Sequence, residues 1–174
     1  LQSLSRHKRD ESEFKRMILY GTQRLKFCLE LYTIQIQGGR YFLHEQPWSA
    51  TSWETRCILE FLQKPELYLV RGDMCAHGMT SSDEVGRAPV LKPTGWLTNS
   101  PCIAERLGVR CSNLYGESTH RHVHLVNGRA RAAQVYPVKL CLAILNGLRD
   151  QLTDDRLMCD TGIGSVCCEE PIFS

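Results

Sequence analysis

The sequence predicts an α/β domain, with a sheet covered by helices on both faces. Two observations support this class: strand-like and helix-like segments alternate over the first 107 residues, and residues 40–45 are aromatic and apolar before turning abruptly polar. Such alternation is typical of a sheet with packed helices, and such a segment is typical of a buried strand. A third observation is that the chain begins with one long amphipathic helix, which comes before the first strand candidate. Because this helix needs a strand to cover, we expect the domain to be truncated at its N-terminus.

Composition narrows the class of protein. The chain has 174 residues, 43% of them hydrophobic and 23% charged, which fits one globular domain with a core. A net charge of +2 permits an anionic partner without requiring one. Nine cysteines with irregular spacing argue against a secreted disulfide scaffold and predict a reducing intracellular compartment, nuclear or cytoplasmic. No apolar run approaches the roughly 18 residues of a membrane span, so no membrane partner is expected.

The first half of the chain predicts a helix, a strand and a second helix. Apolar residues at helical spacing begin at Phe14 and end near Tyr32, and Gly38-Gly39 stops the run. The strand at 40–45 is ended by Pro47. A second helix, capped by a residue among 49–52, is closed by Pro65.

The middle of the chain predicts two more strands. Residues 67–70 form one and residues 95–99 form the other, with a polar loop around residues 81–86 between them. Pro101 then begins a short helix that ends near Leu107.

The C-terminal third changes character. Residues 108–133 are rich in Arg, His, Asn and Gly and form a short basic segment. Pro137 opens a last helix with apolar residues at core spacing. We therefore expect one domain over residues 1–152, with 108–133 as a recognition-like segment, and a tail or linker over 153–174.

Three segments, in this order, resemble the later motifs of the DNA (cytosine-5) methyltransferases. Residues 42–47 (FLHEQP) resemble the family's Glu-Asn-Val motif at a strand end, and residues 73–79 (DMCAHGM) resemble the turn after the next strand. Residues 133–144 (AQVYPVKLCLAI) resemble the segment that opens the family's last helix. The chain also looks like a methyltransferase-like module of mobile-element polyproteins.

The resemblance implies a partial Rossmann-like sheet of the class I methyltransferase type. It implies that Glu45 is the catalytic carboxylate that holds the base, and that Gln134, Val135 and Tyr136 line the site of the cofactor, S-adenosylmethionine. The family's Gly-rich cofactor loop and the Pro-Cys loop with its nucleophile are not found in the sequence. The fragment is therefore expected to be inactive alone and to need the missing N-terminal half of the domain as a partner.

Two readings remain open for the residues that would carry this chemistry. Glu45 would hold the base if the resemblance applies, and otherwise would cap the following helix or pair with Arg56. Cys75 follows a strand, but a buried structural thiol is the favoured interpretation over a nucleophile.

The basic segment offers candidate contacts to the phosphates of DNA. These nucleic-acid-binding candidates are Arg110, Arg121, His122, Arg129 and Arg131. A second hypothesis is thus a non-catalytic nucleic-acid-binding module of a retroelement polyprotein. A solvated basic face with no partner explains the same residues equally well.

A third hypothesis is a small zinc-binding interaction domain built on Cys111 and on His120, His122 and His124. The three histidines alternate and would share one face of a strand. The segment has neither a C-x-x-C nor an H-x-x-x-H pair, and alternating imidazoles are expected to diverge too widely to close a tetrahedral site. A partly exposed β-ribbon is favoured, and no residue is assigned as a metal ligand.

Overall fold

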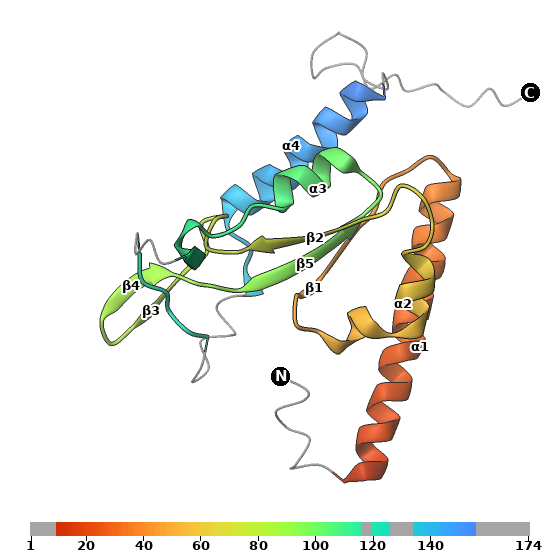
Figure 1. The fold of residues 1–174 in the computed structure, drawn as a ribbon, viewed down its shortest axis with the longest axis horizontal. Coiled ribbons are helices and arrows are strands. Elements are labelled where there is room, and N and C mark those ends of the chain that lie inside the picture. The colour runs from red at the N-terminus through yellow and green to blue at the C-terminus, as the bar shows by residue number, and fades with distance from the viewer. Residues whose placement is uncertain (1–9, 116–119, 126–133, 156–174) are drawn as a thin grey trace, which may run out of the picture.

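The computed structural model describes residues 10–115, 120–125 and 134–155 (Figure 1). It is a mixed α/β structure with two small antiparallel sheets and several helices. The elements are α1 (Glu11–Gln37), β1 (Leu43–Pro47), η2 (Thr51–Glu54), α2 (Arg56–Phe61), β2 (Tyr68–Asp73), β3 (Thr80–Asp83), β4 (Gly86–Pro89), β5 (Pro93–Thr98), α3 (Pro101–Leu107), η3 (Ser112–Tyr115) and α4 (Val138–Asp154). No helix in these ranges is long and apolar enough to cross a membrane.

The main sheet has three strands in the order β1-β5-β2. β1 and β2 are each antiparallel to β5, so they run parallel to one another with β5 between them. The predicted strand–helix–strand unit is present as β1, α2 and β2. Its two strands are not neighbours, because the third predicted strand is inserted between them.

Both faces of the sheet are covered, which confirms the predicted helices on both sides (Figure 1). Neighbouring residues of β5 point to opposite faces, because side chains alternate along a strand. Trp96 packs with α3 and α4, in a core that includes Ile103, Leu107 and Leu140. Leu97 packs with α1 and α2, in a second core that includes Leu25, Leu29, Ile58 and Phe61.

The first strand begins later than predicted, at Leu43 rather than residue 40. The side chain of Asn99 supplies the reason, because it pairs with the backbone that precedes β1. Its Oδ1 accepts from the Phe42 N–H at 3.0 Å, and its Nδ2 donates to the Arg40 carbonyl at 3.1 Å. A side chain therefore replaces the strand partner there.

The prediction of a polar loop around residues 81–86 is wrong, because β3 and β4 pair there as a hairpin. Its turn is closed by a hydrogen bond from the Val85 N–H to the Asp83 side chain at 3.0 Å. Gly86 follows with a φ of 116°, which favours glycine. The two strands have four residues each, β3 is polar throughout and β4 contains Gly86 and Pro89, so neither gives an apolar alternation that a sequence pattern detects.

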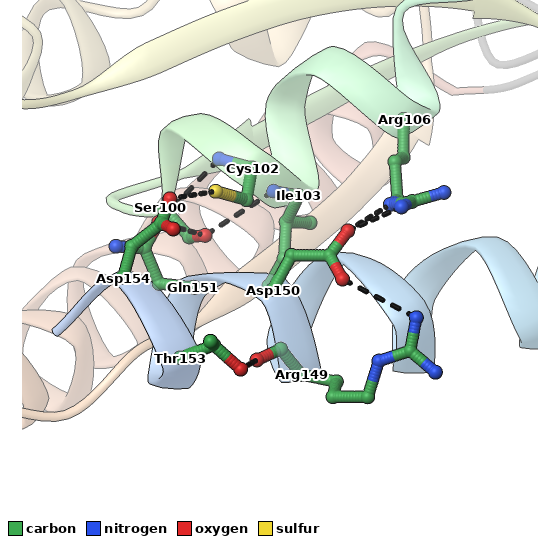
Figure 2. Close-up of polar contacts among 9 residues, drawn as sticks. All are labelled: Ser100, Cys102, Ile103, Arg106, Arg149, Asp150, Gln151, Thr153 and Asp154. Carbon is green, nitrogen blue, oxygen red and sulfur yellow. Dashed lines mark hydrogen bonds and ion pairs between the residues drawn. The ribbon is translucent and has the colours of Figure 1, made fainter. Parts of the chain in front are cut away.

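Helices α3 and α4 are joined by polar contacts as well as by apolar packing (Figure 2). Ser100 caps α3 by accepting from the Ile103 N–H at 3.2 Å, and its hydroxyl donates to the Gln151 Oε1 at 2.7 Å. Arg106 on α3 pairs with Asp150 on α4. Helix α4 runs to Asp154, two residues past the boundary predicted at residue 152. The rest of the predicted tail, residues 156–174, lies outside the described residues.

Candidate metal centre

Four side chains from three segments converge beyond the C-terminal end of β2. They are Cys75, Cys111, His120 and His122, and their potential ligand atoms all lie within 4.8 Å of one another. The Cys111 Sγ lies 3.5 Å from the His120 Nε2 and 3.4 Å from the His122 Nε2. The two Nε2 atoms are 2.9 Å apart. Two sulfurs and two imidazole nitrogens therefore face a common point.

Cys75 is held by a tight turn that directly follows β2. The Ala76 N–H donates to the Asp73 carbonyl at 2.9 Å, and the Gly78 N–H donates to the Cys75 carbonyl at 3.1 Å. Gly78 has a φ of 84°, which suits glycine at the end of such a turn. The Lys139 Nζ donates to the Ala76 carbonyl at 2.9 Å, so the start of α4 fixes the turn from outside.

Cys111 is placed by the chain that returns from α3 alongside β2. The Asp73 N–H donates to the Val109 carbonyl at 2.9 Å. The Asp73 carboxylate, fully buried, accepts from the Cys111 N–H at 3.0 Å and from the Arg110 Nε at 2.9 Å. The last residue of β2 therefore sets the position of a candidate ligand 38 residues later.

The two histidines lie on residues 120–125, which form no strand. This segment is docked on the hairpin, because the Val123 N–H donates to the Pro89 carbonyl at 2.8 Å and the Val123 side chain is buried. Arg121 donates to the Asp83 carboxylate at 2.8 Å and to the Gly86 carbonyl at 2.6 Å. With Val123 and Arg121 fixed to the hairpin, His120 and His122 are directed toward Cys111.

The separations among Cys111, His120 and His122 fit zinc. With Zn–S bonds of about 2.3 Å and Zn–N bonds of about 2.0 Å, a tetrahedron sets its ligands about 3.5 Å apart for S and N and about 3.3 Å apart for two N atoms. The observed S···N separations of 3.5 and 3.4 Å match, and the N···N separation of 2.9 Å is slightly shorter. Two cysteines and two histidines are also among the donor sets that zinc prefers in closed structural sites.

Two of the four side chains have shifted pKa values that bear on cation binding. Burial, followed by the neighbouring His120 and His124, lowers the pKa of His122 and so favours the neutral imidazole that a metal binds. Burial and the adjacent Cys111 raise the pKa of Cys75 to about 12, so the thiol keeps its proton when no cation is near. A bound dication reverses this preference, since it stabilises the thiolate.

The sequence-based view of this cluster was wrong in its geometry. His120 and His122 do not diverge, because they lie on irregular backbone that folds both rings toward Cys111. His124 is exposed and is not part of the cluster, whereas Cys75 completes it. The sequence showed that Cys75 follows a strand, but no local pattern indicated that the turn after this strand would place Cys75 beside Cys111.

Three of the five predicted nucleic-acid-binding residues lie in the described part of the chain, and each contacts other residues there. Arg110 pairs with Asp73, Arg121 pairs with Asp83, and His122 belongs to the candidate metal centre. The remaining two, Arg129 and Arg131, lie outside the described residues. Both described arginines therefore have a structural role, with side chains about 40% exposed.

Two residues assigned through the methyltransferase resemblance are brought together. Glu45 on β1 lies near Tyr136, and burial, followed by this carboxylate, raises the pKa of Tyr136 to about 12. Glu45 also lies 3.7 Å from the Lys92 Nζ. The alternative pairing of Glu45 with Arg56 is wrong, since Arg56 is paired with Glu60. Gln134 and Val135, the other cofactor candidates, are exposed.

Comparisons with protein-family models, with curated proteins and with solved structures found no match to this chain. What the chain does is therefore inferred from its own geometry.

Proposed function

We propose that this chain is a zinc-binding interaction domain whose zinc is structural. The observation that carries the proposal is the convergence of Cys75, Cys111, His120 and His122 within 4.8 Å. Four protein ligands fill a tetrahedral zinc, so no position is left for water or substrate. This closed donor set favours a structural role over a catalytic one.

The proposed zinc would add a cross-link between three parts of the chain. Cys75 lies after β2 and Cys111 lies after α3, while the histidines lie on the segment docked on the β3–β4 hairpin. That segment, residues 120–125, has no regular secondary structure of its own. We expect zinc to hold it more firmly than its contacts with the hairpin alone, because metal binding is coupled to folding.

Metal content tests the proposal. Chain produced with added zinc, dialysed and analysed by atomic emission is expected to contain about one zinc ion per molecule. Removing the metal with a strong chelator is expected to cost at least about 3 kcal/mol, which lowers Tm by about 6–12 °C for a chain of this size. Calorimetry of the metal-loaded and chelated protein measures the shift.

Matched variants separate the site from the remaining cysteines and histidines. His122→Gln and Cys111→Ser are expected to lose the bound zinc, since each removes one of the four ligands. Cys141→Ser and His124→Gln are expected to keep it, because both side chains are exposed and outside the cluster. A folded wild-type chain without zinc, whose Tm does not respond to zinc, would rule out the proposal.

A second candidate function is favoured by the contact between Glu45 and Tyr136. We propose on this ground that the scaffold is the C-terminal part of a Rossmann-like, methyltransferase-type domain, inactive without its other half. The two residues come from different motifs of the resemblance, and their meeting at one face of the sheet supports that reading. The alternative is that the contact serves only the packing of Tyr136 against Trp96.

Calorimetric titration tests this second candidate. S-adenosylmethionine is added to a longer version of the chain that includes the upstream coding sequence, and to its Tyr136→Ala variant. Binding that is weakened by at least about tenfold in the variant supports it, as expected for a residue that lines the cofactor site. An extended chain that binds no S-adenosylmethionine would exclude it.

A further inference from the structure

We propose that the zinc centre is a peroxide-sensitive switch, in which oxidation of Cys75 and Cys111 to a disulfide releases the metal. This inference rests on the proposed zinc function and adds its regulation. It starts from the contact between the two thiols, which lie side by side in the cluster. A reducing compartment keeps them as ligands, and a hydroperoxide is the oxidant the switch requires.

The two sulfurs differ in access, and this sets the order of events. Cys111 is only 3% exposed, whereas Cys75 is partly exposed. A small oxidant therefore reaches Cys75 first, because oxidation of a cysteine follows its exposure. Cys111 is the protected neighbour that reacts second.

The chemistry needs two steps. The Cys75 thiolate attacks one oxygen of hydrogen peroxide, the O–O bond breaks, and hydroxide leaves, which gives a sulfenic acid at Cys75. The Cys111 thiolate then attacks that sulfur, so that an S–S bond forms, the S–O bond breaks and a second hydroxide leaves. The two thiolates lose two electrons, and the peroxide is reduced to two hydroxides.

Loss of both thiolates dismantles the site. The disulfide has no negative charge to offer zinc, and His120 and His122 alone supply two neutral donors. Release of the metal then removes the link between the two histidines and the segments that carry Cys75 and Cys111. The segment at residues 120–125 keeps its contacts with the hairpin, through Val123 and Arg121, but loses those that depend on the metal.

The experiment uses the full zinc-loaded chain. Its zinc content is first measured without oxidant, and hydrogen peroxide is then added in the presence of a chromophoric zinc indicator. We expect the bound zinc to be released, and peptide mapping by mass spectrometry to find a Cys75–Cys111 disulfide in amounts that match it. Dithiothreitol and fresh zinc are expected to restore binding.

Trapping on the zinc-loaded wild type tests the order of attack. With a dimedone probe present during oxidation, sulfenic acid is expected to be captured at Cys75 at least about tenfold more than at Cys111, because the Cys111 thiol is buried. Cys141→Ser is the control: its thiol is the more exposed one, yet zinc release is expected to match that of the wild type.

The outcomes separate the two proposals. If the chain holds no zinc before oxidation, the proposed function itself is wrong. A chain that holds zinc and keeps it under peroxide overturns the switch alone. Zinc release with no Cys75–Cys111 disulfide, or with a disulfide that involves other cysteines, also overturns it, and this measurement on the wild type stands even where a variant fails to fold.

Discussion

The carboxylate of Asp73 accepts a hydrogen bond from the backbone N–H of Cys111 at 3.0 Å. It also accepts from Arg110, and Arg71 lies 3.5 Å from its other oxygen. Burial pushes the pKa of Asp73 upward, but the Cys111 N–H and Arg110 outweigh it and hold the pKa below its usual value. A buried charged group thus fixes the backbone of one proposed zinc ligand without touching the metal itself.

Removing this carboxylate is expected to weaken zinc binding while the fold persists. Asp73→Ala should lower zinc affinity by about 10- to 100-fold, the usual effect of losing a group that positions a ligand. Asp73→Asn should recover part of this loss, because its amide oxygen can still accept from the Cys111 N–H. Competition with a chelator of known affinity measures both variants.

Asp150→Ala is the matched control for Asp73. It removes another carboxylate paired with an arginine, Arg106, at the α3–α4 contact (Figure 2). Zinc affinity is expected to stay within about twofold of the wild type, since a surface ion pair contributes little and this one lies away from the ligands. Equal losses in Asp73→Ala and Asp150→Ala would show that Asp73 acts through general stability alone.

Gly72 is required by a close backbone contact. A Cβ at this position would lie 2.1 Å from the Leu107 carbonyl oxygen and 2.9 Å from the Trp96 Nε1. Gly72→Ala is therefore expected to destabilise the chain by about 1–3 kcal/mol, as overpacking of a core does. Urea unfolding measures the change.

Gly21→Ala is expected to have the opposite effect on stability to Gly72→Ala. Gly21 lies within α1, and nothing stands within 4 Å of the position of its Cβ. Replacing it is expected to stabilise the chain by about 1 kcal/mol, because alanine is the better helix former. Similar effects at Gly21 and Gly72 would contradict the role of the Leu107 contact.

The sequence predicted the elements that have strong local patterns, and it missed contacts between distant residues. The sequence predicted helix α1 from its apolar spacing and the start of α3 from Ser100-Pro101, because both patterns depend only on residues close together in the sequence. The place of β5 between β1 and β2 depends on pairing across many residues, which no local pattern encodes. The meeting of Cys75 with His120 and His122 required the turn after β2 and the docking of residues 120–125.

Gln151 is a buried polar residue that accepts hydrogen bonds from groups at the start of α3. Its Oε1 accepts from the Ser100 hydroxyl at 2.7 Å and from the Cys102 N–H at 3.4 Å (Figure 2). Gln151→Ala leaves the Ser100 hydroxyl without this acceptor, so a loss of about 1–3 kcal/mol is expected. Thr153→Ala, an exposed position two residues on, is expected to change stability by less than about 0.5 kcal/mol. Denaturant unfolding compares the two.

His44 predicts a specific dependence of stability on pH. Burial lowers its pKa below the ordinary value of 6.5, although the neighbouring Glu45 acts in the opposite direction. The imidazole Nδ1 lies 2.8 Å from the hydroxyl of Tyr32, whose own pKa is raised to about 12 by burial, so this partner carries no charge. The other nitrogen, Nε2, is buried without a hydrogen-bond partner. The folded chain therefore favours neutral His44.

Because the pKa of His44 is lowered in the folded chain, stability is expected to decrease as pH falls. Above pH 6.5, neither the folded nor the unfolded chain protonates His44, and the full stability is present. As pH falls from 6.5 toward the lower pKa of the folded state, the unfolded chain binds a proton at His44 that the folded chain does not, so stability falls by up to about 1.4 kcal/mol per pH unit; below the folded-state pKa the loss is complete and this slope ends. His44→Phe should remove this part of the slope. Urea unfolding of the wild type and of His44→Phe from pH 7.5 to 5 measures the effect. The difference between the two proteins is used because acid also releases metal from zinc sites. The control variant is His124→Gln, in which an exposed histidine is replaced. An identical slope in wild type and His44→Phe would show that His44 does not contribute.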